Sequence, residues 1–220
     1  MTRSPKRKSQ SPSTEQVFKL VEQKRDRITT ILRDLIQIPT VVPPGNNYEE
    51  LVDYAEPLFR KMGFHTERVV IPEKLVKAIP VPLEGPRVNL VATREHGCDE
   101  YVTIYAHMDV VPIEEPWTKD PFAGIVEDGK IYGRGVLDMK CGIAGMLVAI
   151  EVMDELALTP HFNLVCTLCT DEEIGVYPGI YHLAKEGYVK GHFLNTELGA
   201  QLPLIIVGTA GDVDVSIKTR

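Results

Sequence analysis

The chain has 220 residues, of which 44% are hydrophobic and 25% are charged, a composition typical of a globular protein. Its formal net charge of −7 argues against a general nucleic-acid binder, because such proteins usually carry a basic excess. No run of about 18 apolar residues occurs, so the sequence predicts no membrane span.

The N-terminal stretch TRSPKRKSQSPST is basic, rich in serine and proline, and without apolar residues. We predict that residues 1–14 form a disordered basic tail, because such a segment buries no apolar surface. No apolar segment of the signal-peptide kind follows the positive charges. The four cysteines do not suggest a disulfide framework of the secreted type, which favours a reducing cytoplasm; they are Cys98, Cys141, Cys166 and Cys169.

Taken in chain order, the apolar pattern predicts alternating helices and strands. Residues 15–37 carry apolar side chains at helical spacing, with Thr14 as a candidate N-cap, and the prolines of IPTVVPPGNN end that helix. A helix over 48–62 stops at Gly63. Asp128-Gly129 between two short alternating runs predicts a β-hairpin. Further strands are predicted at 65–72, 87–95, 100–107, 161–170, 191–197, 202–208 and 212–219, and further helices at 136–156 and 177–187.

This alternation implies an α/β layered domain with a largely parallel central sheet. Cys166 and Cys169 form a C-x-x-C pattern inside one apolar strand. Side chains three residues apart on a strand point to opposite faces, which favours a place in the core over a shared metal.

Polar groups with metal-binding chemistry follow several of the predicted strands, where open α/β sheets usually bind ligands. His107 and Asp109 come after the strand YVTIY. Imidazole binds zinc through one nitrogen, and a nearby carboxylate can accept the other N–H and so fix the ring. The alternative for both residues is a solvated strand end or a turn cap.

Three more carboxylate groups occupy similar places. Asp138 lies at the start of an apolar helix, either as an N-cap or first-turn acid, or as a carboxylate between two metals. Glu172 and Glu173 directly follow a buried strand, where two adjacent carboxylates repel each other unless a cation is present. Glu197 follows the strand GHFLN, and its alternative is a surface acid. The mixed nitrogen and oxygen ligands suit zinc, or else manganese or cobalt.

The motifs AHMDVVP, GRGVLDMKCGIAGML, TDEEIG and NTELG, in this order, resemble those of the M20 family of metallopeptidases and amidohydrolases. The resemblance covers residues 15–220. It implies a three-layer helix-sheet-helix catalytic domain like that of zinc peptidases, and hydrolysis of an amide bond of N-acyl amino acids or small peptides. It further implies two zinc ions and a cis peptide at Asp138–Met139. The implied metal ligands are His107, Asp138, Glu173 and Glu197, with Asp138 bridging the two ions. Glu172 is implied as the general base, and Asp109 as the residue that orients His107.

The sequence departs from the family pattern in two ways. The family's further metal-binding histidine lies far downstream, and His161, His182 and His192 match no ligand motif. The second metal therefore lacks a protein ligand in this chain. Residues 209–220 look like the start of the family's lid or dimerisation domain, so 15–208 would be the N-terminal part of an incomplete catalytic domain. The resemblance implies a homodimer for the longer form, little activity for the bare chain, and a small-molecule substrate rather than nucleic acid or membrane.

Two other functions stay open at this stage. The chain could be a truncated or non-catalytic binding or scaffold protein on the same fold, because fold does not imply function. It could also be a one-metal hydrolase that uses His107, Asp138 and Glu197 alone.

Overall fold

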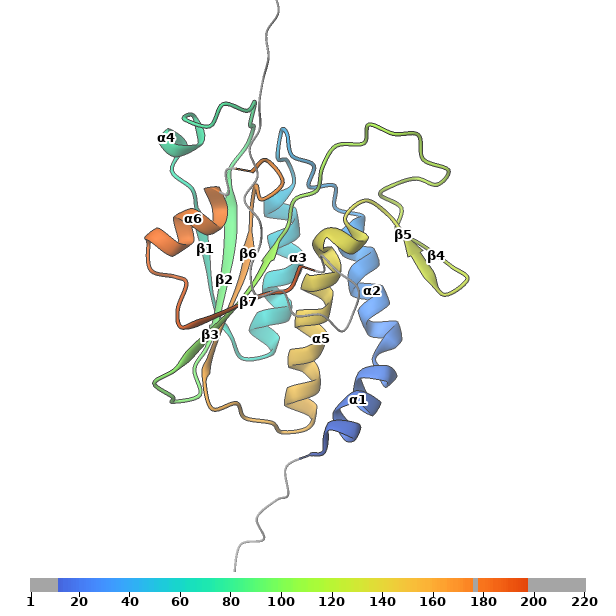
Figure 1. The fold of residues 1–220 in the computed structure, drawn as a ribbon, viewed down its shortest axis with the longest axis vertical. Helices are drawn as coiled ribbons and strands as arrows, with labels where there is room; N and C mark the ends of the chain where they lie inside the picture. Colours follow the sequence, from blue (N-terminus) through green and yellow to red (C-terminus); the bar gives the residue numbers. More distant parts are fainter. Residues whose placement is uncertain (1–11, 176–177, 198–220) are drawn as a thin grey trace, which may run out of the picture.

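A computed structural model describes residues 12–175 and 178–197 of the chain (Figure 1). The elements follow in the order α1 (Thr14–Gln23), α2 (Arg25–Ile36), α3 (Tyr48–Lys61), β1 (His65–Val70), α4 (Glu73–Val76), β2 (Val88–Arg94), β3 (Tyr101–His107), β4 (Ile125–Glu127), β5 (Lys130–Tyr132), the irregular turn η1 (Val136–Lys140), α5 (Cys141–Glu155), β6 (Asn163–Cys169), α6 (Pro178–Lys185) and β7 (His192–Asn195). The predicted strands 202–208 and 212–219 and the lid segment 209–220 lie outside the described residues, as do residues 1–11 of the predicted tail.

Five strands form the central sheet in the order β1-β2-β6-β3-β7, and β4 pairs with β5 in a separate hairpin. β3 lies parallel to β6 and to β7, whereas β2 is antiparallel to both β1 and β6. Four strands therefore run in one direction and β2 alone opposes them, so the sheet is mixed but largely parallel in direction, as the alternation predicts.

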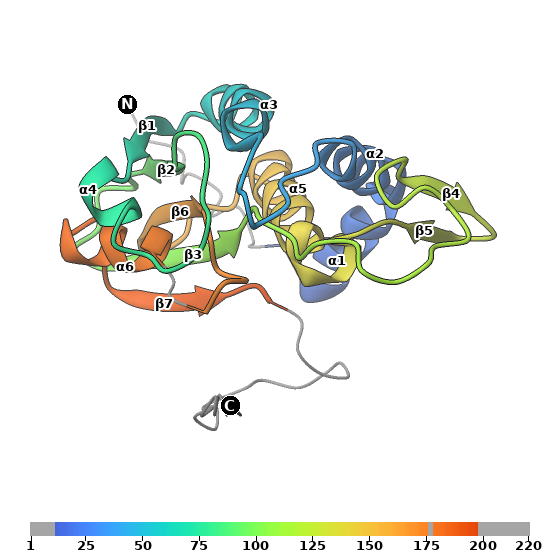
Figure 2. The same ribbon diagram turned by 90° about the horizontal axis from the view of Figure 1, so that it is seen from above.

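Helices cover both faces of this sheet. α3 and α5 lie on one face, with α1 and α2 further out beside α5, and α6 lies on the opposite face (Figure 2). β6 is buried at every position, because it has strands on both sides and helices above and below. The expected three-layer helix-sheet-helix arrangement is confirmed.

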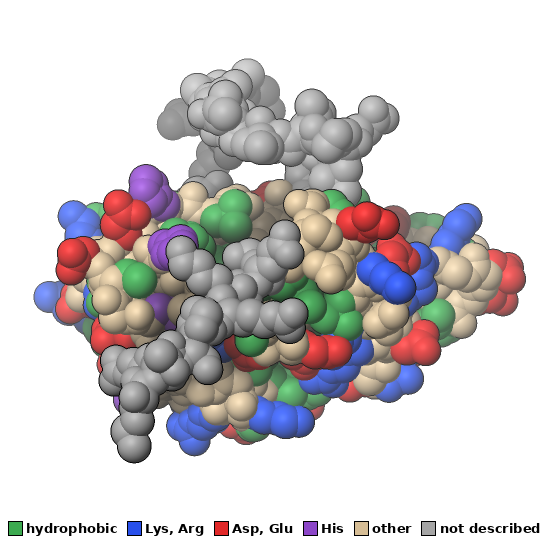
Figure 3. Space-filling model, turned by 90° about the horizontal axis from the view of Figure 1, so that it is seen from below, with side chains coloured by type: hydrophobic (Ala, Val, Ile, Leu, Met, Phe, Trp, Pro, Cys, Tyr) green, Lys and Arg blue, Asp and Glu red, His purple; other side chains and the backbone are tan. Residues whose placement is uncertain are grey.

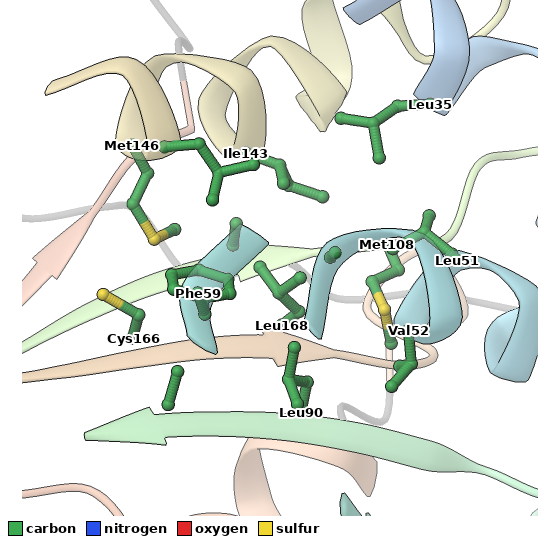
Figure 4. Packing of buried hydrophobic residues seen from close by; sticks show 14 of the residues in the cluster. Leu35, Leu51, Val52, Phe59, Leu90, Met108, Ile143, Met146, Cys166 and Leu168 are labelled. Carbon is green, nitrogen blue, oxygen red and sulfur yellow. The ribbon is translucent and has the colours of Figure 1, made fainter. Parts of the chain in front are cut away.

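The core lies between the sheet and the face formed by α3 and α5. Phe59 and Leu51 of α3 and Ile143 of α5 point toward Leu90 and Leu168 of the sheet (Figure 4). All five side chains are fully buried, which is the largest source of stabilisation in a domain of this kind. Cys166 and Cys169 are both buried and unpaired, as the prediction of a core role requires.

The first predicted helix, 15–37, is in fact two helices that meet at Lys24, where the backbone leaves helical geometry (φ −89°, ψ 8°). The bend keeps both helices against α5: Lys24 pairs with Glu155 at 2.6 Å, and Arg27 of α2 pairs with Glu151 at 2.8 Å. An amphipathic pattern alone does not show such a bend.

The N-terminal boundary also differs from the prediction by one residue. The cap of α1 is Ser13 and not Thr14, because the Ser13 hydroxyl accepts the N–H of Gln16 while the Gln16 side chain accepts the N–H of Ser13. Residues 13 and 14 of the predicted tail therefore belong to the cap and the first turn of α1.

The segment 136–156, predicted as one helix, begins with η1. Asp138 and Met139 have non-helical backbone angles there, and the helix proper starts at Cys141. Asp138 is thus neither the N-cap nor a first-turn acid of α5, and that alternative is wrong. The peptide bond between Asp138 and Met139 is cis, as the family resemblance implies.

Acidic and basic side chains are intermingled over the face drawn in Figure 3.

Within 12–175 and 178–197, no helix is both long and apolar enough to cross a membrane.

Candidate metal centre

Two parallel strands bring the first two motifs together. β3 and β6 pair in register, with His107 opposite Cys169, so the residues that follow each strand leave the sheet at one edge. His107 is fully buried, and its Nε2 lies 3.0 Å from Oδ1 of Asp138 on η1. Its Nδ1 faces Asp109, at 3.1 Å from the backbone oxygen and 3.6 Å from the carboxylate Oδ1. The imidazole is therefore held between two acids.

Asp109 also contacts the other motif. Its Oδ2 accepts the backbone N–H of Glu173 at 2.9 Å, while its buried Oδ1 has no hydrogen-bond donor within the described residues. One carboxylate thus touches both the histidine after β3 and the acid pair after β6. The expected placement of Asp109 beside His107 is what the structure shows, and the contact with Glu173 was not predicted.

The electrostatics of the site favour a positive charge at its centre. Burial alone would lower the pKa of His107, but the carboxylates of Asp109 and Asp138 outweigh it and raise that pKa to about 10. Burial, followed by the negative charge of Asp138, raises the pKa of Glu173 to about 7. Burial likewise raises the pKa of Glu172, whose Oε2 lies 3.8 Å from Nε2 of His107.

Three of the four expected ligands meet in space. The ligand atoms of His107, Asp138 and Glu173 all lie within 4.8 Å of one another, which is a spacing that one metal ion can bridge. Imidazole nitrogen with carboxylate oxygens is a donor set that zinc accepts, and a cation would relieve the repulsion that raises the pKa of Glu173. The Asp138 side chain is 56% exposed, so the group is open to solvent.

Glu197, the fourth expected ligand, stands just outside this group. Its Oε2 accepts from Nδ2 of Asn195 at 3.3 Å, although its charge still contributes to the raised pKa of Glu172. The preceding residue, Thr196, is fixed against α5: a Cβ added at Gly142 would lie 2.6 Å from its Oγ1. Gly142 therefore has no room for a side chain, whereas Gly145 has open space around its Cβ position.

A second set of buried polar residues surrounds the centre and was not identified from the sequence. Tyr48, Arg87 and Asp171 are fully buried and contact one another behind the acid pair. Lys140, also fully buried, donates from Nζ to the backbone oxygens of Leu35 at 2.9 Å and Ile38 at 2.7 Å, which ties α2 to η1. The spacing of these residues in the sequence does not distinguish them from polar residues on the surface. The sequence signal for their burial was their position beside apolar strands and helices.

Comparison with known proteins identifies the family of the chain. The model of peptidase family M20/M25/M40 matches residues 103–215, which is more than half of the chain and includes all of the predicted site residues. Succinyl-diaminopimelate desuccinylase of Wolinella succinogenes is 32% identical over 176 residues, and Cys-Gly metallodipeptidase dug1 of Schizosaccharomyces pombe is 30% identical over 169 residues. Among solved structures, human carnosine dipeptidase 1 has a similar fold, with a TM-score of 0.68 at 22% identity over 82% of this chain.

The fold and the family match therefore place the chain in a peptidase family, and the ligand atoms of the site could hold a metal ion. The chain belongs to peptidase family M20/M25/M40. It spans less than half the length of the relatives it matches, covering 42% of the desuccinylase, 35% of the metallodipeptidase and 40% of the carnosine dipeptidase.

Proposed function

We propose that the protein is a metal-dependent hydrolase that cleaves an amide bond of N-acyl amino acids or small peptides. The observation that carries the proposal is the group formed by His107, Asp138 and Glu173 beside the half-buried Glu172. Such a group provides both a cation site and an acid–base group close together and open to solvent, which is what metal-assisted hydrolysis needs.

We propose that two zinc ions bind here, with cobalt or manganese as alternatives. Asp138 would lie between the ions, His107 and Glu197 would complete one site, and Glu173 would hold the other. When bound, the metals supply Lewis acidity, which makes water a better nucleophile at neutral pH and stabilises negative charge on the substrate's carbonyl oxygen. Asp109 would fix the ring of His107 from the side opposite the metal.

Glu172 is the proposed general base. Its carboxylate lies near the group without belonging to it, and burial raises its pKa toward the range in which a carboxylate can take up and return a proton. In the proposed reaction it removes a proton from the attacking water and then delivers that proton to the leaving amide nitrogen. This leaves the substrate as an acid and an amine.

The relatives support the choice of substrate class. One is a desuccinylase and another a Cys-Gly dipeptidase, and by their names each acts on a small acylated or dipeptide molecule. We propose a small substrate of this kind for the whole protein, together with a homodimeric form and a cytoplasmic location, as the family resemblance and the cysteine usage suggest.

A one-metal form of the same hydrolase is the second candidate. Among the described residues, one group of three mutually close ligand atoms favours it, and that group contains Glu173 in place of the Glu197 expected from the sequence. Metal content of the whole protein separates the two forms: two tightly bound ions exclude the one-metal form, and one ion excludes the two-metal form. One ion on the 220-residue chain alone fits both forms, because the second metal lacks a protein ligand there.

The function itself is tested by turnover. The protein is loaded with Zn²⁺ or Co²⁺ and assayed with a panel of N-acetyl and N-succinyl amino acids and dipeptides, beside its Glu172→Ala variant. We expect hydrolysis by the wild type of the whole protein and none by its variant, and little by the 220-residue chain alone. Metal binding without hydrolysis of any compound on the panel would favour the non-catalytic binding protein instead.

A further inference from the structure

Buried polar residues hold the backbone turn that carries the acid pair, Glu172 and Glu173. Asp171, directly before Glu172, is fully buried and has a φ of 61°, a left-handed conformation that residues other than glycine seldom adopt. Such a conformation persists only where the surroundings hold it. The contacts of Asp171 therefore decide where the two glutamates point.

Two side chains make these contacts. The hydroxyl of Tyr48, at the start of α3, donates to Oδ1 of Asp171 at 2.9 Å. Nε of Arg87, just before β2, lies 3.5 Å from Oδ2. Among the described residues, Asp171 is the sole carboxylate within ion-pair distance of Arg87, and both side chains have no exposure to solvent.

Arg87 is itself fixed by backbone oxygens. Its Nη2 donates to Pro44 at 2.5 Å, and its Nη1 donates to Gly85 at 3.0 Å and also to Glu84. A Cβ at Gly45 would lie 2.4 Å from Nη2, so the chain passes the guanidinium more closely than any other residue would allow. The guanidinium is thus held in one place, and Asp171 lies beside it at ion-pair distance, with no hydrogen bond between Nε and Oδ2.

We propose that Tyr48 and Arg87 are positioning residues for the acid pair, and that they act through Asp171 on Glu172 and Glu173. The inference deepens the proposed function and rests on it for the roles of the two glutamates. Asp109 holds the same turn from the other side, through the N–H of Glu173. A turn held at both ends keeps its carboxylates in place before any metal or substrate arrives, which is what an efficient site requires.

A role in the fold alone explains this arrangement less well. Placing an ion pair in a dry interior costs desolvation that apolar side chains of the same size would not, so buried pairs often contribute little net stability. The pair here lies at the edge of the core, and its carboxylate, Asp171, directly precedes the two glutamates in the chain. The need to hold the acid pair in place therefore explains the position of the ion pair between Arg87 and Asp171.

The test compares two tyrosines of the same helix. Tyr48→Phe removes the hydroxyl that reaches Asp171, whereas Tyr54→Phe removes a hydroxyl that donates to Asp34 at 3.2 Å, away from the site. Hydrogen exchange is measured on backbone amides 170–175 of the metal-free chain, and Zn²⁺ affinity is measured by competition with a chelator. Arg87 is not the variant of choice, because loss of one partner from a buried pair destabilises the whole fold.

We expect faster exchange of these amides in Tyr48→Phe and not in Tyr54→Phe, together with Zn²⁺ affinity about tenfold weaker, the lower end of what such supporting contacts contribute. Unchanged exchange in Tyr48→Phe, or equally faster exchange in both variants, would overturn the proposal. Selective loosening in a chain that binds no Zn²⁺ would support the positioning role and count against the proposed metal function.

Discussion

Asp109→Asn is the substitution that probes the electrostatics of the site most cleanly. The side chain is fully buried, with Oδ1 3.6 Å from Nδ1 of His107 and Oδ2 accepting the N–H of Glu173. Asparagine keeps the shape and can still accept from Glu173 through its amide oxygen. The negative charge behind the imidazole is what disappears.

The loss of this negative charge sets the expected change in Zn²⁺ affinity. Residues that orient a metal-binding histidine contribute roughly 10- to 100-fold in metal affinity. Because the contact with Glu173 survives, we expect Zn²⁺ affinity to fall by a factor within that range. Without the acid, the pKa of His107 should also fall, since Asp109 is the largest influence that raises it.

The assay is a Zn²⁺ competition titration on the wild type, on Asp109→Asn and on Asp120→Asn. Asp120 is a matched control, because its Oδ1 accepts the N–H of Phe122 at 2.8 Å in an exposed loop and makes no contact with the metal group. We expect the control to bind as the wild type does. Equal affinity in Asp109→Asn and the control would refute the view that Asp109 supports His107.

Three further outcomes follow. Glu172→Ala should abolish turnover while metal content stays near that of the wild type, and loss of metal would mean that Glu172 and Glu173 have exchanged roles. Glu56→Gln should lower the free energy of unfolding in urea by about 2 kcal/mol, because the buried Glu56 carboxylate accepts hydrogen bonds from Arg60 and Arg68. Asp53→Asn should change it little, because Asp53 is an exposed ion-pair partner of Arg68. Burial would raise the pKa of Glu56, but Arg68 and Thr66 outweigh burial and lower that pKa below the usual 4.5. The Glu56 carboxylate therefore stabilises the fold above pH 4.5. The difference in unfolding free energy between the wild type and Glu56→Gln should disappear as the pH falls through the lowered pKa. A thiol reagent should modify the native chain at no more than two cysteines, because Cys166 and Cys169 are fully buried, and rapid modification of four would contradict the packing of β6.

The sequence predicts the fold where apolar periodicity and chain order act together. Alternating strands and helices indicate the layered sheet, and the ends of β3 and β6 meet because parallel neighbours in register finish at the same edge. That rule brings His107 and the acid pair together without any tertiary information. It also explains why the residues that follow strands contained most of the candidate ligands.

The missed features depend on tertiary contacts. η1 interrupts a continuous apolar pattern because Asp138 must turn toward His107, and periodicity does not report a backbone that bends for a polar contact. Arg87 and Tyr48 look like an ordinary strand edge and an ordinary helix residue; their importance comes from Asp171, which the chain places beside them only on folding. Glu197 matches the motif, yet its carboxylate turns to Asn195, a local contact that a motif does not encode.

The central claim is a metal site built from His107, Asp138 and Glu173, and metal stoichiometry tests it most directly. Zinc and cobalt per chain are measured by elemental analysis after equilibration and desalting, for the wild type and for Asp138→Ala. The account predicts stoichiometric metal in the wild type and its loss in the variant, since Asp138 is the exposed member that contacts His107 at 3.0 Å. Equal metal in both proteins would contradict the site, because it would place the ion on other residues.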